Sequence, residues 1–423
     1  MPSLEFFRLQ TREEVLARYY RFAPVGLEEV ALVAAGGRVL AGDVAAPEDV
    51  PGFLRAAMDG HAVRAADTFG ASVAAPQYLQ IKGEVAMGAA AERGVGPGEV
   101  MRVPTGAMLP AGADAVIMVE YTAEHPDGTL EVRRPVAPGE NVLKPGEDVR
   151  QGEVLFPAGR RLRPQEIGLL AALGVATLTV YRRPRVAILS SGDEILPVDQ
   201  KPGPGQVRDC NAFLVAAQVM EWGGLPLLKG IITDDFTALK TALAAALATA
   251  DLILISGGSS VGTRDLTLEA IKALPGAEIL AHGVAIRPGK PTILASLEKK
   301  GDKGEKPLMG LPGHPASAAV VMEVLGRPLL NRLSGLEGAA SWGSTVTAML
   351  SRNLAGASGR EDYVRVRLRR EGETIWADPV LGPSGLLSPM VKSDGLVMIP
   401  LGVEGLVKGA TVTVKLFRRM TCG

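Results

Sequence analysis

The feature that most constrains the fold is an alternation of strand-like and helix-like segments between residues 185 and 333. Short apolar runs end in polar loops, and segments of helix length separate them. This order predicts a parallel sheet with right-handed crossover helices, that is, a doubly wound α/β domain over 181–333. The expected strands are RVAILS, LPLLKGII, DLILIS and PLMGL, and the expected helices are NAFLVAAQVMEWGG, DFTALKTALAAALATA, DLTLEAIKAL and PASAAVVMEVLGRPLL. Two further strands are expected at AEILAHGVAI and PTILAS, followed by a solvated hairpin tip, LEKKGDKGEKP.

The rest of the chain reads as β-rich units with a few helices. Pro and Gly punctuate short apolar runs over 51–140, which predicts a β-rich lobe. The tail 334–423 alternates apolar and polar residues and predicts a second β domain. Helices are expected over 11–22, after a capping box, over 26–40, and over 161–174.

Composition excludes several classes of protein. The chain has 423 residues, which favours two to four domains, and 47% hydrophobic residues, which suits several packed cores. A net charge of -1 gives no general attraction to nucleic acid. Two cysteines exclude a disulfide scaffold and a zinc cluster built on thiolates. The longest apolar run is too short to span a bilayer, and the first residues lack a signal-peptide pattern, so a cytoplasmic protein with no membrane partner is expected.

Polar loops follow each expected strand of the α/β domain. Ligands of an open parallel sheet bind beyond the carboxyl ends of its strands, so these loops are the candidate site. Glycines allow close approach of the backbone to a phosphate, and hydroxyls add hydrogen-bond donors. The helix expected to start near Asp265 offers its positive end. The loops are Ser190–Glu194, Thr233–Asp235, Ser256–Asp265, Arg287–Pro291 and Leu311–Pro315.

The charges in these loops suggest a metal and an anion. Several carboxylates at one edge are costly unless a cation lies among them, and Mg²⁺ prefers oxygen ligands and phosphates. Arg287 and Lys290 can hold an anion. Taken singly, each feature has a plain structural reading as a tight turn, a helix cap, a solvated carboxylate or a surface charge. Only their joint position favours a site for a phosphate-bearing ligand, and there is no GxxxxGK[ST] motif.

Several motifs in fixed order resemble the MoeA/gephyrin family. AILSSGDEI, ISGGSSVGTRD, IRPGKP and LPGHPAS are similar to the family's molybdopterin-binding domain. DVPGFLRAAMDGHAVR, VPTGAMLPAGADAVIMVE and NVLKPGEDVRQGEVLFPAG resemble elements of its N-terminal part. The resemblance covers about residues 10–420 and is weakest in the C-terminal β domain.

The resemblance implies a four-part fold. It comprises an elongated helical and β domain (1–50 and 141–180), an inserted β-rich lobe (51–140), the α/β domain (181–333) and a C-terminal β-barrel (334–423). Family members form homodimers, with a cleft between the α/β domain of one subunit and the inserted lobe of the other. The implied activity is molybdopterin molybdotransferase: with Mg²⁺, adenylylated molybdopterin and molybdate give molybdenum cofactor and AMP. The molybdopterin adenylyltransferase that supplies the substrate is the implied partner.

The resemblance also assigns roles to residues. The implied catalytic residues are Asp59, Thr105, Asp148, Glu194, Asp235 and Asp265. The implied ligands for Mg²⁺ are Glu194, Asp234, Asp235 and Asp265. The implied substrate-binding residues are Ser191, Gly192, Gly257, Gly258, Ser259, Arg287, Lys290, Pro312, Gly313, His314 and Pro315.

Three residues depart from the family pattern. Arg287 replaces a frequent lysine, His314 a frequent asparagine and Ser191 a threonine. Arginine has a different reach from lysine, which leaves a direct contact with molybdate open. The alternatives are a pterin-binding or scaffold protein, an unrelated phosphotransferase that prefers ATP, and a tungstate-inserting paralogue.

Overall fold

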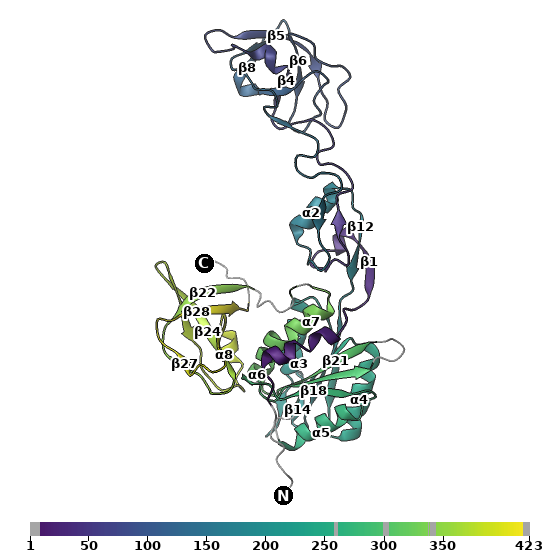
Figure 1. The fold of residues 1–423 in the computed structure, drawn as a ribbon, viewed down its shortest axis with the longest axis vertical. Helices are drawn as coiled ribbons and strands as arrows, with labels where there is room; N and C mark the ends of the chain where they lie inside the picture. Colours follow the sequence, from purple (N-terminus) through teal and green to yellow (C-terminus); the bar gives the residue numbers. More distant parts are fainter. Residues whose placement is uncertain (1–8, 258–260, 299–303, 337, 339–343, 418–423) are drawn as a thin grey trace.

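The computed structural model describes residues 9–257, 261–298, 304–336, 338 and 344–417, without the side chains of 261–265. The chain is elongated (Figure 1). A β-rich lobe lies at one end and a narrow neck joins it to an α/β unit, which has a β-barrel at its side. Among the described residues, no helix is long and apolar enough to cross a membrane.

The α/β unit is built on a six-stranded sheet in the order β16-β13-β17-β21-β20-β18. β13, β16, β17 and β21 run parallel, as the sequence predicts. The expectation of an all-parallel sheet is wrong for The strands are β13 (Arg185–Ser191), β16 (Leu225–Ile232), β17 (Leu252–Gly257), β18 (Glu278–His282), β20 (Ile293–Glu298) and β21 (Glu305–Leu311).

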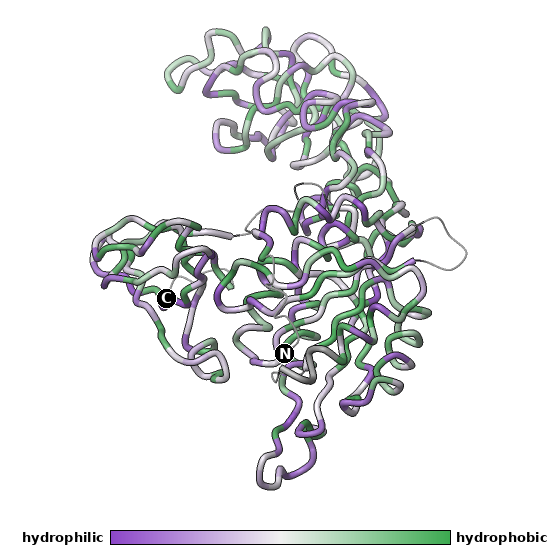
Figure 2. Tube along the Cα trace, turned by 60° about the horizontal axis from the view of Figure 1, so that its bottom comes forward, coloured by the Kyte–Doolittle hydropathy of each residue, from purple (hydrophilic) through white to green (hydrophobic). Residues whose placement is uncertain are grey.

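Helices cover both faces of this sheet. Successive strand residues point to opposite faces, so Val186 joins one core and Ala187 the other. One face carries α3 (Asn211–Glu221) and a continuous helical segment made of α6 (Pro315–Val321), η5 (Met322–Gly326) and α7 (Arg327–Leu333). The other face carries α4 (Phe236–Thr249) and α5 (Val261–Lys272). The strands form the hydrophobic interior of this unit (Figure 2).

The start of α5 corrects one expectation. The helix begins at Val261, four residues before Asp265, so Asp265 lies inside the helix and is not its N-cap. The side chain of Asp265, like Gly258 and Ser259, lies outside the described residues.

The neck consists of two short antiparallel pairs and one helix. β1 (Leu27–Ala31) pairs with β12 (Thr177–Tyr181), β2 (Val44–Ala45) pairs with β11 (Val154–Phe156), and α2 (Pro164–Ala172) packs beside them. The expected helix over 26–40 is wrong, because Leu27–Ala31 is a strand followed by the short 3₁₀ helix η2 (Leu32–Ala34). Pairing with β12 provides hydrogen-bond partners for the backbone of Leu27–Ala31, and such a tertiary contact overrides a weak helix propensity.

The first helix is shorter than expected and belongs to another core. α1 (Arg12–Leu16) has the predicted capping box between Thr11 and Glu14, and the 3₁₀ helix η1 (Tyr19–Arg21) continues it. Val15, Tyr19 and Phe22 are buried in the α/β core, where the Tyr19 hydroxyl donates to the Leu325 carbonyl at 3.0 Å. The chain therefore starts on the α/β unit before it enters the neck.

The lobe contains a six-stranded sheet in the order β7-β4-β6-β5-β9-β8. A further pair, β3 (Arg55–Ala56) with β10 (Val142–Leu143), also lies in this part of the chain. The sheet strands are β4 (Gly60–Val63), β5 (Gln77–Glu84), β6 (Glu99–Val103), β7 (Ala115–Met118), β8 (Thr122–Glu124) and β9 (Thr129–Val132).

The C-terminal unit is a closed barrel. Its strands pair in the order β24-β25-β22-β28-β26, and β26 pairs again with β24, which closes the ring. A two-residue strand, β19 (Ile286–Arg287), joins the barrel edge from the α/β unit. The barrel strands are β22 (Thr345–Leu350), β24 (Glu361–Glu371), β25 (Thr374–Pro379), β26 (Gly395–Ile399) and β28 (Thr411–Leu416).

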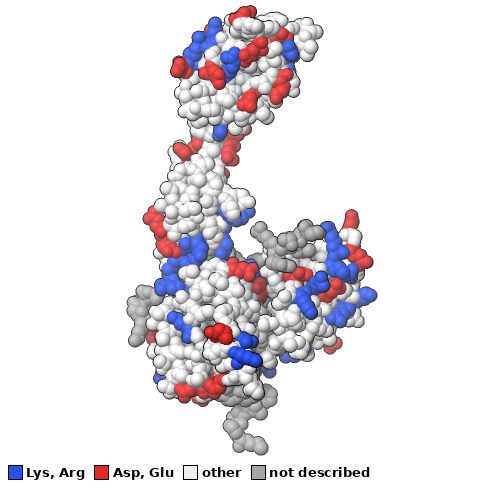
Figure 3. Space-filling view, turned by 180° about the vertical axis from the view of Figure 1, so that it is seen from behind, with Lys and Arg blue, Asp and Glu red and all other residues white. Residues whose placement is uncertain are grey.

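Basic side chains gather where the neck meets the α/β unit (Figure 3). Arg38, Arg161 and Arg182 lie at this junction. Arg182 binds Asp251 through both guanidinium nitrogens, and Arg38 binds Glu28. Arg161 donates to the carbonyls of Gly37 and Trp222. These contacts tie the neck to the α/β unit.

Candidate active site at the carboxyl edge of the central sheet

The carboxyl ends of the four parallel strands lie at one edge of the sheet. β16, β13, β17 and β21 end at Ile232, Ser191, Gly257 and Leu311, respectively. The loops after these strands therefore open on the same side, as expected for a ligand site in an open sheet.

The larger of two adjoining pockets lies above β13 and β17. It has a volume of about 350 Å³. The Cys210 thiol faces it, and burial raises the pKa of this thiol, which therefore stays protonated at neutral pH. The lining residues are Glu194, Ile195, Val207, Arg208, Asp209, Cys210, Asn211, Gly257, Gly313, His314, Pro315 and Gly385.

Gly257 is required by the close approach of two strand ends. A Cβ at this position would lie 2.1 Å from the Ser191 carbonyl oxygen, and φ is +157°. Any side chain would therefore push β17 away from β13. Gly257 keeps the floor of the pocket narrow and leaves the backbone exposed to a ligand.

The carboxylates at this edge have different environments. Glu194 is exposed and lines the large pocket. Asp234 accepts a hydrogen bond from the Ser191 hydroxyl at 2.6 Å. Asp235 caps α4 by accepting from the Ala238 amide at 2.8 Å, so the helix-cap reading of this residue is confirmed.

The second pocket lies between the α/β unit and the barrel and is rich in cations. It has a volume of about 250 Å³ and shares Gly313 and His314 with the first pocket. Its lining residues are Ile286, Arg287, Pro288, Gly289, Lys290, Pro291, Pro312, Gly313, His314, Ser317, Arg360 and Ser384.

Two of its side chains are held by contacts with the barrel. Arg287 Nη2 donates to Asp362 Oδ2 at 2.5 Å. His314 Nδ1 lies 3.1 Å from the Ser384 hydroxyl. The pocket is therefore assembled from two structural units.

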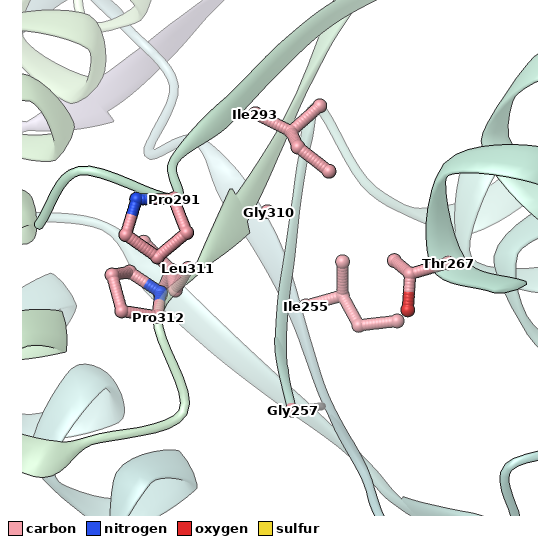
Figure 4. Close-up of a pocket in the computed structure, with 8 residues that line it drawn as sticks. All are labelled: Ile255, Gly257, Thr267, Pro291, Ile293, Gly310, Leu311 and Pro312. Atoms are coloured by element: carbon pink, nitrogen blue, oxygen red, sulfur yellow. The ribbon is translucent and has the colours of Figure 1, made fainter. Parts of the chain in front are cut away.

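A third cavity is too small for the substrate. It holds about 20 Å³, room for about one water molecule. Figure 4 shows Pro291 and Pro312 side by side near the end of β21, with Ile255 and Thr267 on the other side of the cavity. Pro291 and Pro312 also line the cationic pocket, so this cavity lies against its wall.

The implied site residues of the lobe lie elsewhere. Asp59 accepts hydrogen bonds from the Thr105 amide at 2.6 Å and the Thr105 hydroxyl at 2.9 Å. These bonds lower the pKa of Asp59. Both residues are exposed, as is Asp148. The lobe and the α/β unit occupy opposite ends of the chain (Figure 1), so one chain does not bring these residues to the sheet edge.

The donor set bears on the expected Mg²⁺. No three carboxylate, histidine or cysteine side chains form a metal-binding group among the residues whose side chains are described. Mg²⁺ bound by substrate phosphates needs only one or two protein carboxylates. Glu194, exposed in the large pocket, fits that role. Asp234 and Asp235 already accept hydrogen bonds through one oxygen each.

Sequence reasoning missed several pocket residues. Arg360 and Ser384 come from the barrel, and no local pattern connects them with IRPGKP. Asn211 donates to the Gly313 carbonyl at 2.8 Å, and Asp209 accepts from the Ala212 amide. The polar run before α3 could have indicated a helix cap, though not a pocket wall.

Three family models match consecutive parts of the chain. "MoeA N-terminal region (domain I and II)" matches residues 10–174. "Probable molybdopterin binding domain" matches residues 187–332, and "MoeA C-terminal region (domain IV)" matches residues 347–417. Fold and pockets thus define a multidomain protein whose α/β unit is of the molybdopterin-binding type.

Full-length relatives agree with these matches. The molybdopterin molybdenumtransferase of Bacillus subtilis is 34% identical over 411 residues, covering 96% of this chain and 94% of that protein. The enzyme of the same name from Nostoc sp. is 35% identical over 391 residues, covering 92% and 88%. The crystal structure of the molybdopterin biosynthesis MoeA protein from Pyrococcus horikosii has a TM-score of 0.80 and 36% identity, covering 98% of this chain and 100% of that one. The chain belongs to the MoeA family.

Proposed function

We propose that the protein is a molybdopterin molybdenumtransferase, which converts adenylylated molybdopterin and molybdate into molybdenum cofactor and AMP. The observation that carries the proposal is the junction of the two pockets at Gly313 and His314. A substrate with a phosphate linkage fits the larger pocket, and a tetrahedral dianion fits the cationic one. The two reactants would meet at the shared wall.

The residues would divide the work as follows. Ser191, Gly192 and the strand-end amides hold the phosphate and pterin groups, together with Gly258 and Ser259 of the same loop. Lys290 and Arg360 hold molybdate, assisted by the hydroxyls of Ser317 and Ser384. Pro312 and Pro315 shape the loop between the pockets. Bound Mg²⁺ would offset the negative charge of the phosphates, with Glu194 as its first ligand and Asp234, Asp235 and Asp265 in support.

The lobe would act in a second copy of the chain. Asp59, Thr105 and Asp148 are exposed and distant from the pockets of their own chain. A homodimer in which the lobe of one subunit covers the sheet edge of the other would complete the site. We further propose a cytoplasmic protein that receives its substrate from a molybdopterin adenylyltransferase. The four-part domain division is kept, with residues 11–22 assigned to the α/β unit.

The test is release of AMP from adenylylated molybdopterin by the purified protein with Mg²⁺ and molybdate. AMP should appear only when molybdate is present, stop when EDTA removes the metal, and return with added Mg²⁺. Binding of the pterin without AMP release would support a scaffold role. Competition between molybdate and tungstate would identify the preferred anion.

A further inference from the structure

We propose that Asp362 is a positioning residue of the cationic pocket, which fixes Arg287 against the barrel and sets the charge that the pocket presents to its anion. The inference rests on the proposed function, because it concerns the pocket assigned to molybdate. It goes beyond that proposal in naming a barrel residue outside every motif of the resemblance.

Asp362 is a buried carboxylate that collects contacts from both structural units. It lies on β24 and is 1% exposed. Its Oδ2 atom accepts from Arg287 Nη2 at 2.5 Å and from the Ala357 amide at 2.7 Å. Its Oδ1 atom lies 3.9 Å from Arg360 Nε. Asp362 therefore lies between two of the three cations that line the pocket.

The backbone supports the same junction. β19 runs parallel to β24, with Ile286 beside Glu361 and Arg287 beside Asp362. The Glu361 amide donates to the Ala285 carbonyl at 2.9 Å. The loop that carries Lys290 is thus attached to the barrel strand that follows Arg360. Asp362 is the buried charge at the seam where the two walls of the pocket meet.

Charge explains what this arrangement achieves. Arg287, Lys290 and Arg360 bring three positive charges to one pocket. Like charges repel, and a buried carboxylate among them offsets one. The guanidinium of Arg287 is committed to Asp362, which leaves Lys290 and Arg360 to face the ligand. The remaining charge of about two matches a tetrahedral dianion such as molybdate.

Glu361 provides a matched control on the same strand. It is 6% exposed and accepts from Arg12 Nε at 3.1 Å and from the Tyr363 hydroxyl at 2.5 Å. It also joins the barrel to the rest of the chain, through α1, but it does not line the cationic pocket. Asp362→Asn and Glu361→Gln therefore remove equivalent buried charges, one beside the pocket and one away from it.

The experiment measures binding of molybdate, and of sulfate as an inert probe, to the full-length protein by calorimetry, with thermal melting as the stability control. Asp362→Asn should raise the Kd for molybdate about tenfold, the lower end of the loss seen when a supporting partner is removed from a metal site. The KM for molybdate should rise in parallel, with kcat for AMP release within about twofold. Glu361→Gln should lower the melting temperature and leave the Kd unchanged.

A second variant keeps the proposal testable if Asp362→Asn fails to fold. Arg287→Met should raise the Kd by a similar factor, and the double variant should be no worse than the weaker single one, because both changes break one unit. Equal losses in Asp362→Asn and Glu361→Gln, or additive losses in the double variant, would overturn the proposal. If the parent binds molybdate or sulfate but releases no AMP, the proposed function fails, and the binding data still test Asp362.

Discussion

The sheet edge and the lobe differ in how completely each is assembled within one chain. At the sheet edge, two pockets share a wall, and buried contacts such as Arg287 with Asp362 fix that wall across two structural units. In the lobe, Asp59 and Thr105 form an exposed pair at the other end of the molecule. The difference indicates that the edge can bind ligands alone, whereas the lobe needs a second surface to act on.

The largest effect is expected at the sheet edge. Lys290→Ala should lower kcat/KM for molybdate about 100-fold, because it removes a charged donor that no neighbour replaces in the same position. Steady-state release of AMP over a range of molybdate concentrations gives this value. Lys240→Ala, which removes an exposed lysine from α4, is the control and should behave like the parent. A Lys290→Ala protein with parental KM for molybdate would place the anion elsewhere.

A smaller and different effect is expected in the lobe. Asp59→Ala should lower kcat for AMP release about tenfold, the scale of a single charged hydrogen bond, and should leave the Kd for adenylylated molybdopterin within about twofold. Rapid-quench assays and equilibrium binding separate the two quantities. Asp127→Ala is the matched control, because Asp127 is also exposed in the lobe and accepts from the Thr129 amide. Loss of substrate affinity as large as the loss of turnover would remove the distinction between the two regions.

The smallest effect concerns stability of the lobe in acid. Burial lowers the pKa of His61, which is 2% exposed and hydrogen-bonded through Nε2 to Glu124. Arg102 lowers the pKa of Glu124 to about 2. Both groups bind fewer protons in the folded state than in the unfolded state, so their stabilisation is complete at neutral pH.

The lobe should therefore lose stability as pH falls below about 6.5, where unfolded histidine takes up a proton, and again below about 4.5, where unfolded glutamate does. Thermal melting from pH 7.5 to 5.0 should show the lobe transition moving down by a few degrees. His61→Phe should abolish the part of this change that lies above pH 5. An equal change in the His61→Phe protein would assign it to other groups.

Much of the fold was predictable from local pattern. The four parallel strands and the helices after them follow from apolar runs and turn residues that each segment carries itself. The failures arose where a distant partner decides. Leu27–Ala31 is a strand because Thr177–Tyr181 pairs with it, and β20 is antiparallel because it returns through a hairpin.

The candidate site divides in the same way. Glu194, Gly257, Lys290 and His314 were singled out because each stands in a loop after, or close to, a strand end. Arg360 and Asp362 follow about 70 residues later, in a barrel strand with no motif to distinguish them. Their position depends on β19 pairing with β24, a contact that composition and spacing do not encode.

The central claim is that a complete site combines the sheet edge of one chain with the lobe of another. Its most direct test mixes inactive Asp59→Ala and Lys290→Ala proteins, allows the subunits to exchange, and measures AMP release. In a twofold dimer, half of the molecules would be mixed, and each would have one intact site of two, so about a quarter of the parental activity should return. Activity no greater than the average of the two separate proteins, after exchange has been verified, would contradict the account.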